Sequence, residues 1–439
     1  RKLFVLIALV ALATVAFASG TEEEAAGQAE PVTIRVLSYF HTGSDDYPLY
    51  SGYMEDFEEA NPGVVIEHEG LESAAARTKL SVEMASGNPP DVSFMVLGLA
   101  REYSSQGLLL DLQPFVSADA EWESIYTPTA VASVSWDGGM YLIPSQAHYG
   151  GLFYNPAVLA EAGFDGPAET WSELLEQAEA LREVDKYAFL TSGQNFRYAW
   201  LISQIMVRTA GVDNINSLYT GDLKTSWDDP DAGFIAALER MQELVEVEGF
   251  PPDVNGLTGE VAQLLFGDGE AAYWYEGTWH VNGFENSVSG EFRDRLEWTT
   301  FPTIAGAAGD QTGGVGGPLL GWGVSSKIED EAKLEYVIDF VRGIESREVA
   351  TRHLRERSQP TGTRPFEDAW DSIHPLLESI LTAYADIPVT VYPTDVGAPS
   401  PVDNAIKRIA VPGIIAGSLT PEEAAAEVNA RAVEFWSEQ

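Results

Sequence analysis

The segment 267–279, GDGEAAYWYEGTW, places four large aromatic residues behind a turn of small residues. If the segment is a strand, Tyr273 and Tyr275 point to one face and Trp274 to the other, because side chains alternate along a strand. The strand is expected to end just before Trp279. An aromatic residue at such a position can lie at the rim of a cleft, whereas one inside a strand is usually core. The pattern predicts a core Trp274 and leaves Trp279 open between core packing and ligand contact.

The sequence lacks the common catalytic motifs. It contains no G-x-S-x-G, H-E-x-x-H or G-x-x-x-x-G-K-[ST] pattern, and the glycine run at 313–317 lacks the lysine of a phosphate loop. Six histidines are scattered, and Asp228, Asp229 and Asp231 lack the spaced glutamate of a calcium loop, so neither a metal nor another cofactor is expected. The absence of cysteine excludes disulfides and a thiolate nucleophile. Among 68 acidic residues no carboxylate pair is singled out for glycoside hydrolysis, so the sequence favours a protein that is not an enzyme.

The amino terminus has the pattern of an export signal. Two basic residues precede an apolar run at 3–18 with small residues at Ala16 and Ala18, which predicts a signal peptide over 1–18. A membrane anchor is the alternative, but the run is short and lacks a basic flank. Polar residues 19–30 are expected to be a flexible tether. We therefore expect export to the periplasm or to the outer face of the cytoplasmic membrane.

Acidic residues far outnumber basic ones. The chain has 25 Lys and Arg against 68 Asp and Glu, and removal of Arg1 and Lys2 with the signal peptide would leave 23 against 68, a net charge of −45. Such a charge repels nucleic acid and anionic membranes. Because the acids are spread along the chain, we interpret them as a solubility feature suited to a salty environment.

About 400 residues follow the predicted signal peptide and tether, and 45% of the residues of the whole chain are apolar. A chain of this length and composition can form two hydrophobic cores. Strands are predicted at 32–37, 64–69 and 91–96, with helices over 47–60 and 74–86 between them. Strand–helix–strand units with short joins predict a parallel sheet and an α/β fold. Further helices are predicted from the capping box that opens at Thr170, from the apolar stripe around Val337 and from Thr420-Pro421 near the end.

Four motifs occur in the order found in family 1 extracellular solute-binding proteins, the maltose-binding-protein-like receptors of ABC importers. The first motif follows W-x-G-x-Y-x-x-P, L-x-Y-N, E-A-G and P-x-T-W-x-E-L, and the one departure is the insertion Ala168-Glu169 between the proline and Thr170. It is carried by Trp136, Gly138, Tyr141, Pro144, Leu152, Tyr154, Asn155, Glu161-Ala162-Gly163, Pro167, Thr170-Trp171 and Glu173. The second, F-x-x-G-E-A-A followed by G-x-W, is carried by Phe266, Gly269, Glu270, Ala271, Ala272, Gly277 and Trp279. The segments 61–67 with 89–92 and 419–424 supply the other two. The chain therefore resembles this family over nearly its whole length.

The resemblance implies a two-lobed periplasmic-binding-protein fold of type II, with ligand bound in the cleft between hinged lobes. The chain is expected to cross between lobes near 145–149, near 297–301 and around Ile344. The N-terminal lobe would then contain 31–146 plus 299–343. The C-terminal lobe would contain 147–298 plus 344–439.

The resemblance also implies binding positions. In many relatives the tryptophan of the G-x-W motif stacks on a sugar ring, whose apolar C–H face suits an aromatic plane, so Trp279 becomes the first candidate. The other candidates lie at strand ends, at the expected hinge and on a loop of the second lobe, and for each a structural role is the alternative. They are Trp322, Phe40, His41, Asp45, Glu72, Met95, Gln146, His148, Asn195 and Arg197.

The function implied is that of a receptor which captures a mono- or oligosaccharide by lobe closure and delivers it to the permease subunits of an ABC importer. We expect it to act as a monomer. Two alternatives remain open. One is a secreted carbohydrate-active enzyme, and the other is the same binding fold used for a solute other than a sugar.

Overall fold

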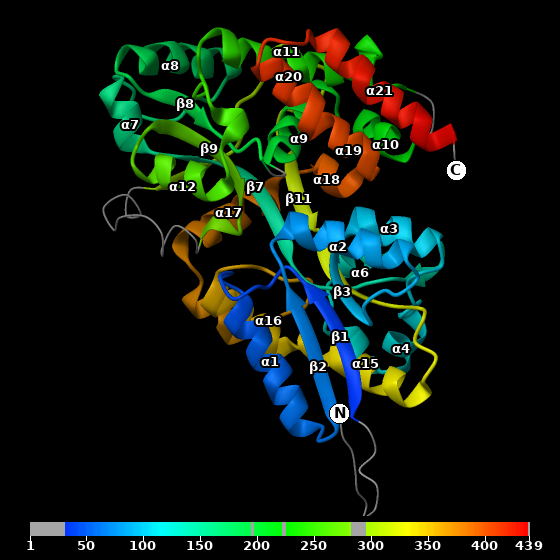
Figure 1. The fold of residues 1–439 in the computed structure, drawn as a ribbon. Helices are drawn as coiled ribbons and strands as arrows, with labels where there is room; N and C mark the ends of the chain where they lie inside the picture. The colour runs from blue at the N-terminus through cyan, green and yellow to red at the C-terminus, as the bar shows by residue number, and fades with distance from the viewer. Residues whose placement is uncertain (1–30, 195–196, 222–224, 282–295, 438–439) are drawn as a thin grey trace, which may run out of the picture.

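The N-terminal lobe is built on the predicted strand–helix–strand units. The computed structural model describes residues 31–194, 197–221, 225–281 and 296–437, so the predicted signal peptide and tether lie outside the described residues. The sheet has the order β2-β1-β3-β12-β6, and Figure 1 labels β1, β2 and β3 of it. Its strands are β1 (Val32–Ser38), β2 (Val64–Gly70), β3 (Val92–Val96), β6 (Ile143–Pro144) and β12 (Leu320–Val324). β1 is parallel to β2 and β3, as the sequence predicted, and β12 runs antiparallel to β3 and β6.

Helices of this lobe return the chain between strands and cover the sheet. The predicted helices form as α1 (Tyr47–Ala60) and α2 (Ser73–Ala85), and the carboxylate of Glu72 caps α2 by accepting from the Ala74 N–H. The remaining elements are α3 (Leu97–Ser105), α4 (Gln113–Ala118), α5 (Ala120–Ser124), α6 (Pro128–Val134), the hairpin strands β4 (Ser135–Trp136) and β5 (Gly139–Met140), α15 (Glu331–Ile344) and α16 (Arg347–Arg357).

The C-terminal lobe has its own sheet, in the order β13-β11-β7-β9-β8, with β10 also paired to β7. Its strands are β7 (Ala147–Tyr154), β8 (Tyr187–Leu190), β9 (Ala271–Gly277), β10 (Glu297–Thr299), β11 (Gly314–Pro318) and β13 (Thr390–Val391). β9 is the strand predicted from the aromatic segment, and it ends at Gly277. Trp274 is fully buried inside it, as expected.

Helices surround this second sheet. The capping box predicted at Thr170 and Glu173 is present and opens α8. The helices are α7 (Pro156–Glu161), α8 (Trp171–Glu183), α9 (Arg197–Thr209), α10 (Val212–Thr220), α11 (Phe234–Glu246), α12 (Gly259–Gly267), α17 (Pro375–Asp386), α18 (Thr394–Gly397), α19 (Ser400–Ala405), α20 (Val411–Ile415) and α21 (Pro421–Ser437), with the π-helical turn η4 (Ile406–Ala410) between α19 and α20. Among the described residues, no helix combines the length and apolar character needed to span a bilayer.

The sheets divide the chain differently from the predicted boundaries at two of the three crossings. The first crossing lies between β6 and β7, within 145–149. The second lies at Leu319, between β11 and β12, and not near 297–301, because β10 pairs with β7 inside the second lobe. The third follows α16 and not Ile344, because α16 packs against α1 of the first lobe.

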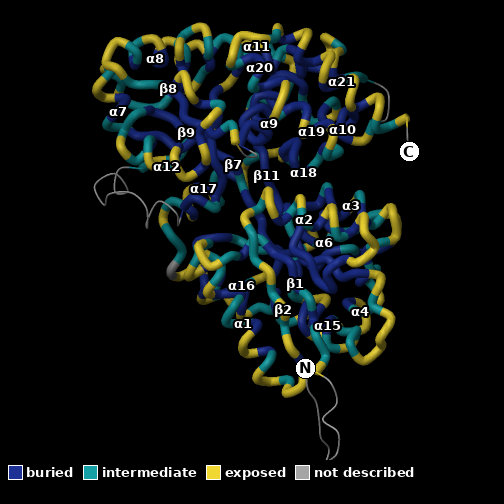
Figure 2. Tube along the Cα trace, in the orientation of Figure 1, coloured by how far each residue is buried: buried dark blue, intermediate teal, exposed yellow. Residues whose placement is uncertain are grey.

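The three crossings run side by side and bond to one another. The central one, Ser145–Ala147, exchanges backbone hydrogen bonds with Leu319 and Leu320 on one side. On its other side, the Ala147 N–H donates to the Pro360 carbonyl at 3.0 Å. Gln146 also forms a bridge with Thr361. The hinge is therefore a narrow three-stranded ribbon, and buried residues fill the lobe on either side of it (Figure 2).

Candidate functional site

A chain of polar side chains crosses the hinge from one lobe to the other. In the first lobe, Arg357 Nε donates to Asp46 Oδ1 at 3.1 Å, and Gln146 Nε2 donates to Asp46 Oδ2 at 3.2 Å. Gln146 Oε1 lies 3.1 Å from His148 Nε2, and His148 Nδ1 lies 3.4 Å from the Thr278 hydroxyl of the second lobe. Because Gln146 stands on the central crossing, its side chain links groups held by both lobes.

Burial makes His148 a neutral member of this chain. It lowers the pKa of His148 from 6.5 to about 3. Since the Gln146 amide nitrogen donates to Asp46, its oxygen must accept from His148 Nε2–H, and His148 Nδ1 is left to accept from Thr278. Burial also raises the pKa of Asp46, but the stronger combined effect of His353 and Arg357 lowers it to about 2. The hinge thus holds a fixed pattern of donors and acceptors at neutral pH.

Trp279 forms an aromatic corner beside this chain. Its ring meets Trp200 of α9 edge-on, with 4.7 Å between centroids, and meets His148 edge-on at 5.1 Å. A Cβ placed on Gly277 would come within 2.1 Å of the Trp279 ring, so only glycine lets the ring lie over the strand end. The Trp279 side chain stays partly exposed, in contrast to the fully buried Trp274.

Buried charges fix the orientation of this corner. Arg197 forms an ion pair with Glu276, and Arg197 Nη2 lies 2.9 Å from His280 Nε2. Burial raises the pKa of Glu276, while Arg197 and a hydrogen bond from Trp279 oppose that rise. Trp279 and the buried Arg197–Glu276 pair therefore belong to one interacting cluster at the end of β9.

Charges from both lobes act on Glu260 of α12, near this corner. Hydrogen bonds from its own backbone and from Thr258 lower the pKa of Glu260 on α12, and the charges of Arg197 and His41 lower it further. His41 belongs to the loop after β1, so groups from both lobes act on one carboxylate.

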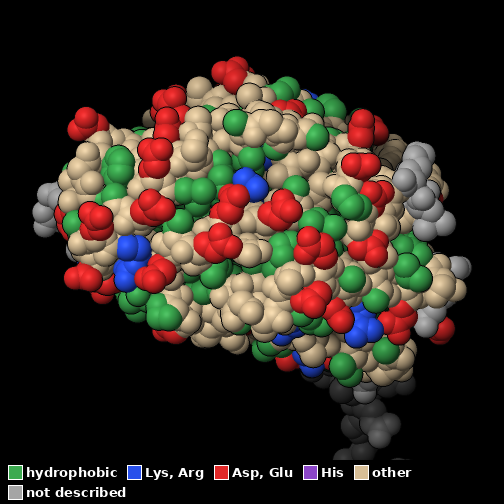
Figure 3. All heavy atoms as spheres, turned by 90° about the horizontal axis from the view of Figure 1, so that it is seen from above, with side chains coloured by type: hydrophobic (Ala, Val, Ile, Leu, Met, Phe, Trp, Pro, Cys, Tyr) green, Lys and Arg blue, Asp and Glu red, His purple; other side chains and the backbone are tan. Residues whose placement is uncertain are grey.

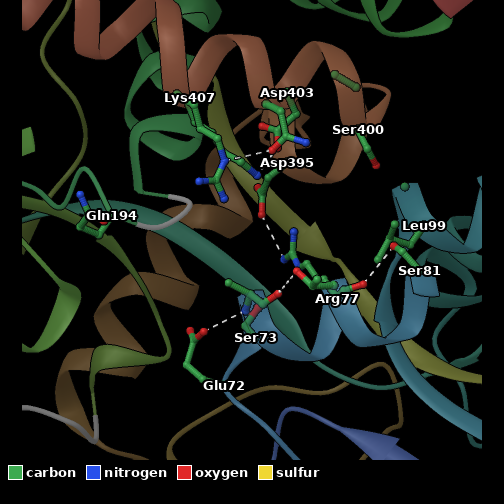
Figure 4. A pocket seen from close by; sticks show the side chains of 16 residues that line it. Glu72, Ser73, Arg77, Ser81, Leu99, Gln194, Asp395, Ser400, Asp403 and Lys407 are labelled. Carbon is green, nitrogen blue, oxygen red and sulfur yellow. Dashed lines mark hydrogen bonds and ion pairs between the residues drawn. The ribbon is translucent and has the colours of Figure 1, made fainter. Parts of the chain in front are cut away.

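A cavity of about 490 Å³ lies between the lobes (Figure 4). The first lobe lines it with α2 and α3, and the second lobe with α18, α19, η4 and the loop after β8. Arg77 Nη2 of α2 meets Asp395 Oδ2 of α18 at 3.2 Å, an ion pair that joins the lobes. Ser400 donates to Glu102 at 3.4 Å, a second contact between them. In addition, Gly98 of α3 lies so close to α18 that a Cβ there would be 2.8 Å from the Val396 carbonyl oxygen.

The predicted site residues fall into distinct environments. Gln146, His148, Trp279 and Arg197 lie together at the hinge and the aromatic corner, and Glu72 lines the cavity while capping α2.

Phe40, Met95 and Trp322 are core residues and need correction as binding candidates. Their exposed fractions are 3%, 0% and 0%. Trp322 packs against Phe40 and donates its indole N–H to Glu345 at 2.9 Å. Each of them points inward from its strand or strand end, so none reaches the cavity surface.

Two other candidates of the first lobe have local partners, and one candidate is not described. Asp45 forms an ion pair with Arg357 at 3.1 Å, and His41 Nδ1 accepts from the Gly43 N–H at 3.2 Å in its own loop. Asn195 lies outside the described residues.

The cavity residues Arg77, Asp395, Asp403 and Lys407 were not predicted. Arg77 and Asp395 are 318 residues apart in sequence and no motif marks either one. The only available signal was the position of Asp395 in a Pro- and Gly-rich segment, which is too common to be specific.

The arrangement is suited to binding a solute. Arg77 and Lys407 of the cavity are each paired with an acid, and the hinge offers neutral donors and acceptors beside an aromatic ring. Within the described ranges, no group of three or more His, Asp or Glu is placed to hold a metal ion. Such a site fits a neutral, polar solute with an apolar face.

Curated relatives match parts of the chain. The xylose/arabinose-binding protein XacG of Haloferax volcanii is 25% identical over 275 residues, which cover 60% of this chain and 57% of that protein. The galactooligosaccharide-binding protein of Bacillus subtilis is 24% identical over 215 residues, 47% of each chain. The chain thus spans about half the length of the curated relatives it matches.

Solved structures match the fold nearly end to end. A chitin oligosaccharide binding protein superposes with a TM-score of 0.82 at 23% identity, covering 92% of this chain and 99% of that chain. Maltose-bound MalE3 of T. maritima gives a TM-score of 0.74 at 19% identity, with coverages of 92% and 99%. At these identities the likeness establishes the two-lobed fold. The family profile of the bacterial extracellular solute-binding proteins matches residues 42–343, more than half of the sequence. The chain belongs to the bacterial extracellular solute-binding protein family.

Proposed function

We propose that the protein is an exported receptor that captures a carbohydrate between its two lobes and passes it to an ABC importer. The observation that carries this proposal is the aromatic corner at the hinge, where Trp279 stands partly exposed beside His148 and Gln146. A pyranose has an apolar C–H face and a rim of hydroxyls, so one ring contact combined with neutral donors and acceptors matches its chemistry.

The two-lobed fold supplies the capture mechanism. A solute that contacts both lobes is bound fully only when they are together, so binding shifts the population toward the closed conformation. The polar chain from Asp46 through Gln146 to Thr278 lies at the pivot of that motion. We infer that the closed form is the one presented to the permease.

The relatives support the carbohydrate class. Two of the curated relatives are named for xylose or arabinose and for galactooligosaccharide, and the two structures cited above are named for chitin oligosaccharide and maltose. The proposal also includes export, directed by the signal peptide over 1–18, and a location outside the cytoplasmic membrane. It further includes function as a monomer.

A thermal-shift screen over sugars, polyols and polyamines tests the proposed solute class. A solute at 100 times its Kd stabilises the native state by about 2.7 kcal/mol, which is readily detected. We expect a sugar to give the largest shift and to be recovered chemically intact after prolonged incubation. A polyamine or other non-sugar as the sole stabiliser, or cleavage of the sugar, would contradict the proposal.

A further inference from the structure

A second cavity, the rear cavity, lies on the face of β7 that points away from the aromatic corner. Its volume is about 660 Å³, and Tyr149 of β7 lines it. The preceding residue of the same strand, His148, contacts Trp279 instead. Side chains alternate between the two faces of a strand, so Tyr149 points away from the corner that we assign to the solute. Figure 1 shows α17, which lines the rear cavity with Leu381, to the left of β7, and α2 and α18 to its right.

The walls of the rear cavity come from both lobes and from the third crossing. The first lobe supplies Ile125 and Leu354, the second lobe supplies side chains of β7 and α17, and the crossing supplies the segment 360–365. Trp370 lines the cavity as well and is 47% exposed, although an indole ring is usually mostly buried. The volume lies within the range of ~300–1,000 Å³ that is typical of sites for small molecules.

Two arginine side chains line the rear cavity without an acidic partner. Arg347 donates from Nε to the Arg364 carbonyl at 3.2 Å and from Nη2 to the Pro365 carbonyl at 3.1 Å. Its guanidinium also lies 4.6 Å from the centre of the Phe366 ring. These contacts hold the planar group in place and leave Nη1 without a hydrogen-bond partner among the described residues. Arg364 is exposed, and within the described part of the chain its side chain forms no hydrogen bond or ion pair.

The charge of this wall differs from that of the chain. The protein has 25 Lys and Arg against 68 Asp and Glu, and in the cavity between the lobes Arg77 and Lys407 are each paired with an acid. In the rear cavity Glu367 is the one acidic residue beside the two arginines, so the wall is net positive in a chain of net charge −43. A guanidinium presents its donors in a planar fork that matches the two oxygens of a carboxylate.

We propose that the rear cavity binds a small organic carboxylate. Arg347 and Arg364 hold the carboxylate group, and the apolar body of the ligand packs against Trp370 and the aliphatic side chains of the wall. An aromatic carboxylate such as benzoate is the simplest ligand of this class. This anion site goes beyond the proposed carbohydrate function, because it lies on the opposite face of β7 from Trp279 and its wall is charged, whereas the hinge offers neutral donors and acceptors.

A fluorine NMR titration of the full chain with para-fluorobenzoate tests the site. At about 0.15 M salt the Debye length is about 8 Å, so repulsion of the ligand by distant acids is screened. We expect one molecule to bind saturably per chain, and para-fluorobenzyl alcohol, which has the same ring without the charge, to bind at least tenfold more weakly. Arg364→Ala should weaken para-fluorobenzoate about tenfold, the scale of one lost hydrogen bond to a charged group, and Trp370→Ala should weaken it through loss of the ring contact.

Arg431→Ala is the matched control. Arg431 lies on α21, outside the rear cavity, and pairs with Glu434 at 3.0 Å, so its replacement removes the same charge from another surface and should leave the Kd unchanged. Equal losses in Arg364→Ala and Arg431→Ala would assign the effect to overall charge and overturn the inference. Equal binding of the alcohol and the carboxylate, or no saturable binding by the unsubstituted protein, would also overturn it.

The sugar found by the thermal-shift screen separates the two sites. It should leave para-fluorobenzoate bound, because the solute and the anion occupy opposite faces of β7. Complete displacement of para-fluorobenzoate by the sugar would place the anion in the cleft between the lobes and overturn the inference. If no sugar binds while Arg364→Ala still loses the anion, the proposed carbohydrate function fails and the anion site stands.

Discussion

At the residue scale, two tryptophans only five positions apart have different environments. Trp274 is fully buried within β9 and packs against Phe266, whereas Trp279 lies partly exposed over Gly277. The difference arises because β9 ends between them, which frees the second ring from the sheet. We therefore expect Trp274 to contribute to stability and Trp279 to be available for contact with a solute.

Replacement of each tryptophan by alanine should separate these roles. We expect Trp279→Ala to weaken sugar binding by roughly 1–3 kcal/mol, the scale of an aromatic anchor, with a smaller loss of stability. Trp274→Ala should destabilise the protein by about 3–5 kcal/mol because it empties a core site. Calorimetric titration and urea unfolding of both variants provide the comparison. Normal binding by a poorly stable Trp279→Ala would show that this ring is structural.

A buried carboxyl near the hinge predicts a dependence of stability on pH. Burial raises the pKa of Glu345 to about 7, although hydrogen bonds from Ser145, Trp322 and Tyr50 oppose the rise. The native state therefore holds a proton that the unfolded state loses near pH 4.5. The contribution of this group to the free energy of unfolding is therefore greatest below pH 4.5. It decreases as the pH rises from 4.5 to 7, by about 3 kcal/mol in all.

Glu345→Gln should remove that loss, because its amide oxygen can still accept from Trp322 and Tyr50. We expect the variant to be about 2–3 kcal/mol more stable than the unsubstituted protein at pH 8 and nearly equal to it at pH 5, measured by urea unfolding. Glu329→Gln, at an exposed position, corrects for the loss of one negative charge. The same gain in both variants would assign the effect to overall charge.

At the scale of elements, local sequence signals predicted most helices and strands. The Thr170 capping box opens α8, and Asn61-Pro62-Gly63 follows the end of α1, because these features act within a few residues. The second crossing was misplaced because the pairing of β10 with β7 joins distant segments. For the same reason the sequence could not reveal Arg77 and Asp395, or show that Trp322 faces the core.

The approach of α3 to α18 gives a prediction about lobe closure. Alanine at Gly98 would place a Cβ 2.8 Å from the Val396 carbonyl oxygen and so keep the lobes apart. We expect Gly98→Ala to weaken solute binding while leaving the thermal stability of the solute-free protein unchanged or raised, since alanine favours a helix. Gly52→Ala in α1, where nothing lies within 4 Å, is the control and should bind normally. Normal binding by Gly98→Ala would show that closure does not need this contact.

At the scale of the whole molecule, the main feature is the large excess of negative charge. The net charge is −43, and acidic side chains are spread over the face seen in Figure 3 with few basic ones between them. Exposed ion pairs contribute little to stability, so mutual repulsion of the acids is only partly offset. Repulsion of this kind reaches far at low ionic strength and is screened by salt.

Thermal stability should therefore rise with salt. At ~10 mM salt the Debye length is about 30 Å, and at 1 M it is about 3 Å, so we expect a higher melting midpoint in molar sodium or potassium chloride. Melting curves at both concentrations measure this. An unchanged midpoint would show that the acids are compensated locally, and the interpretation of a salty environment would be withdrawn.

The most direct measurement of carbohydrate capture is a calorimetric titration of the purified protein with the sugar that gives the largest thermal shift. We predict a saturable heat with one sugar bound per chain, and recovery of the sugar without cleavage. No saturable binding of any sugar, or its hydrolysis during the titration, would contradict the proposal that this two-lobed protein is a carbohydrate receptor.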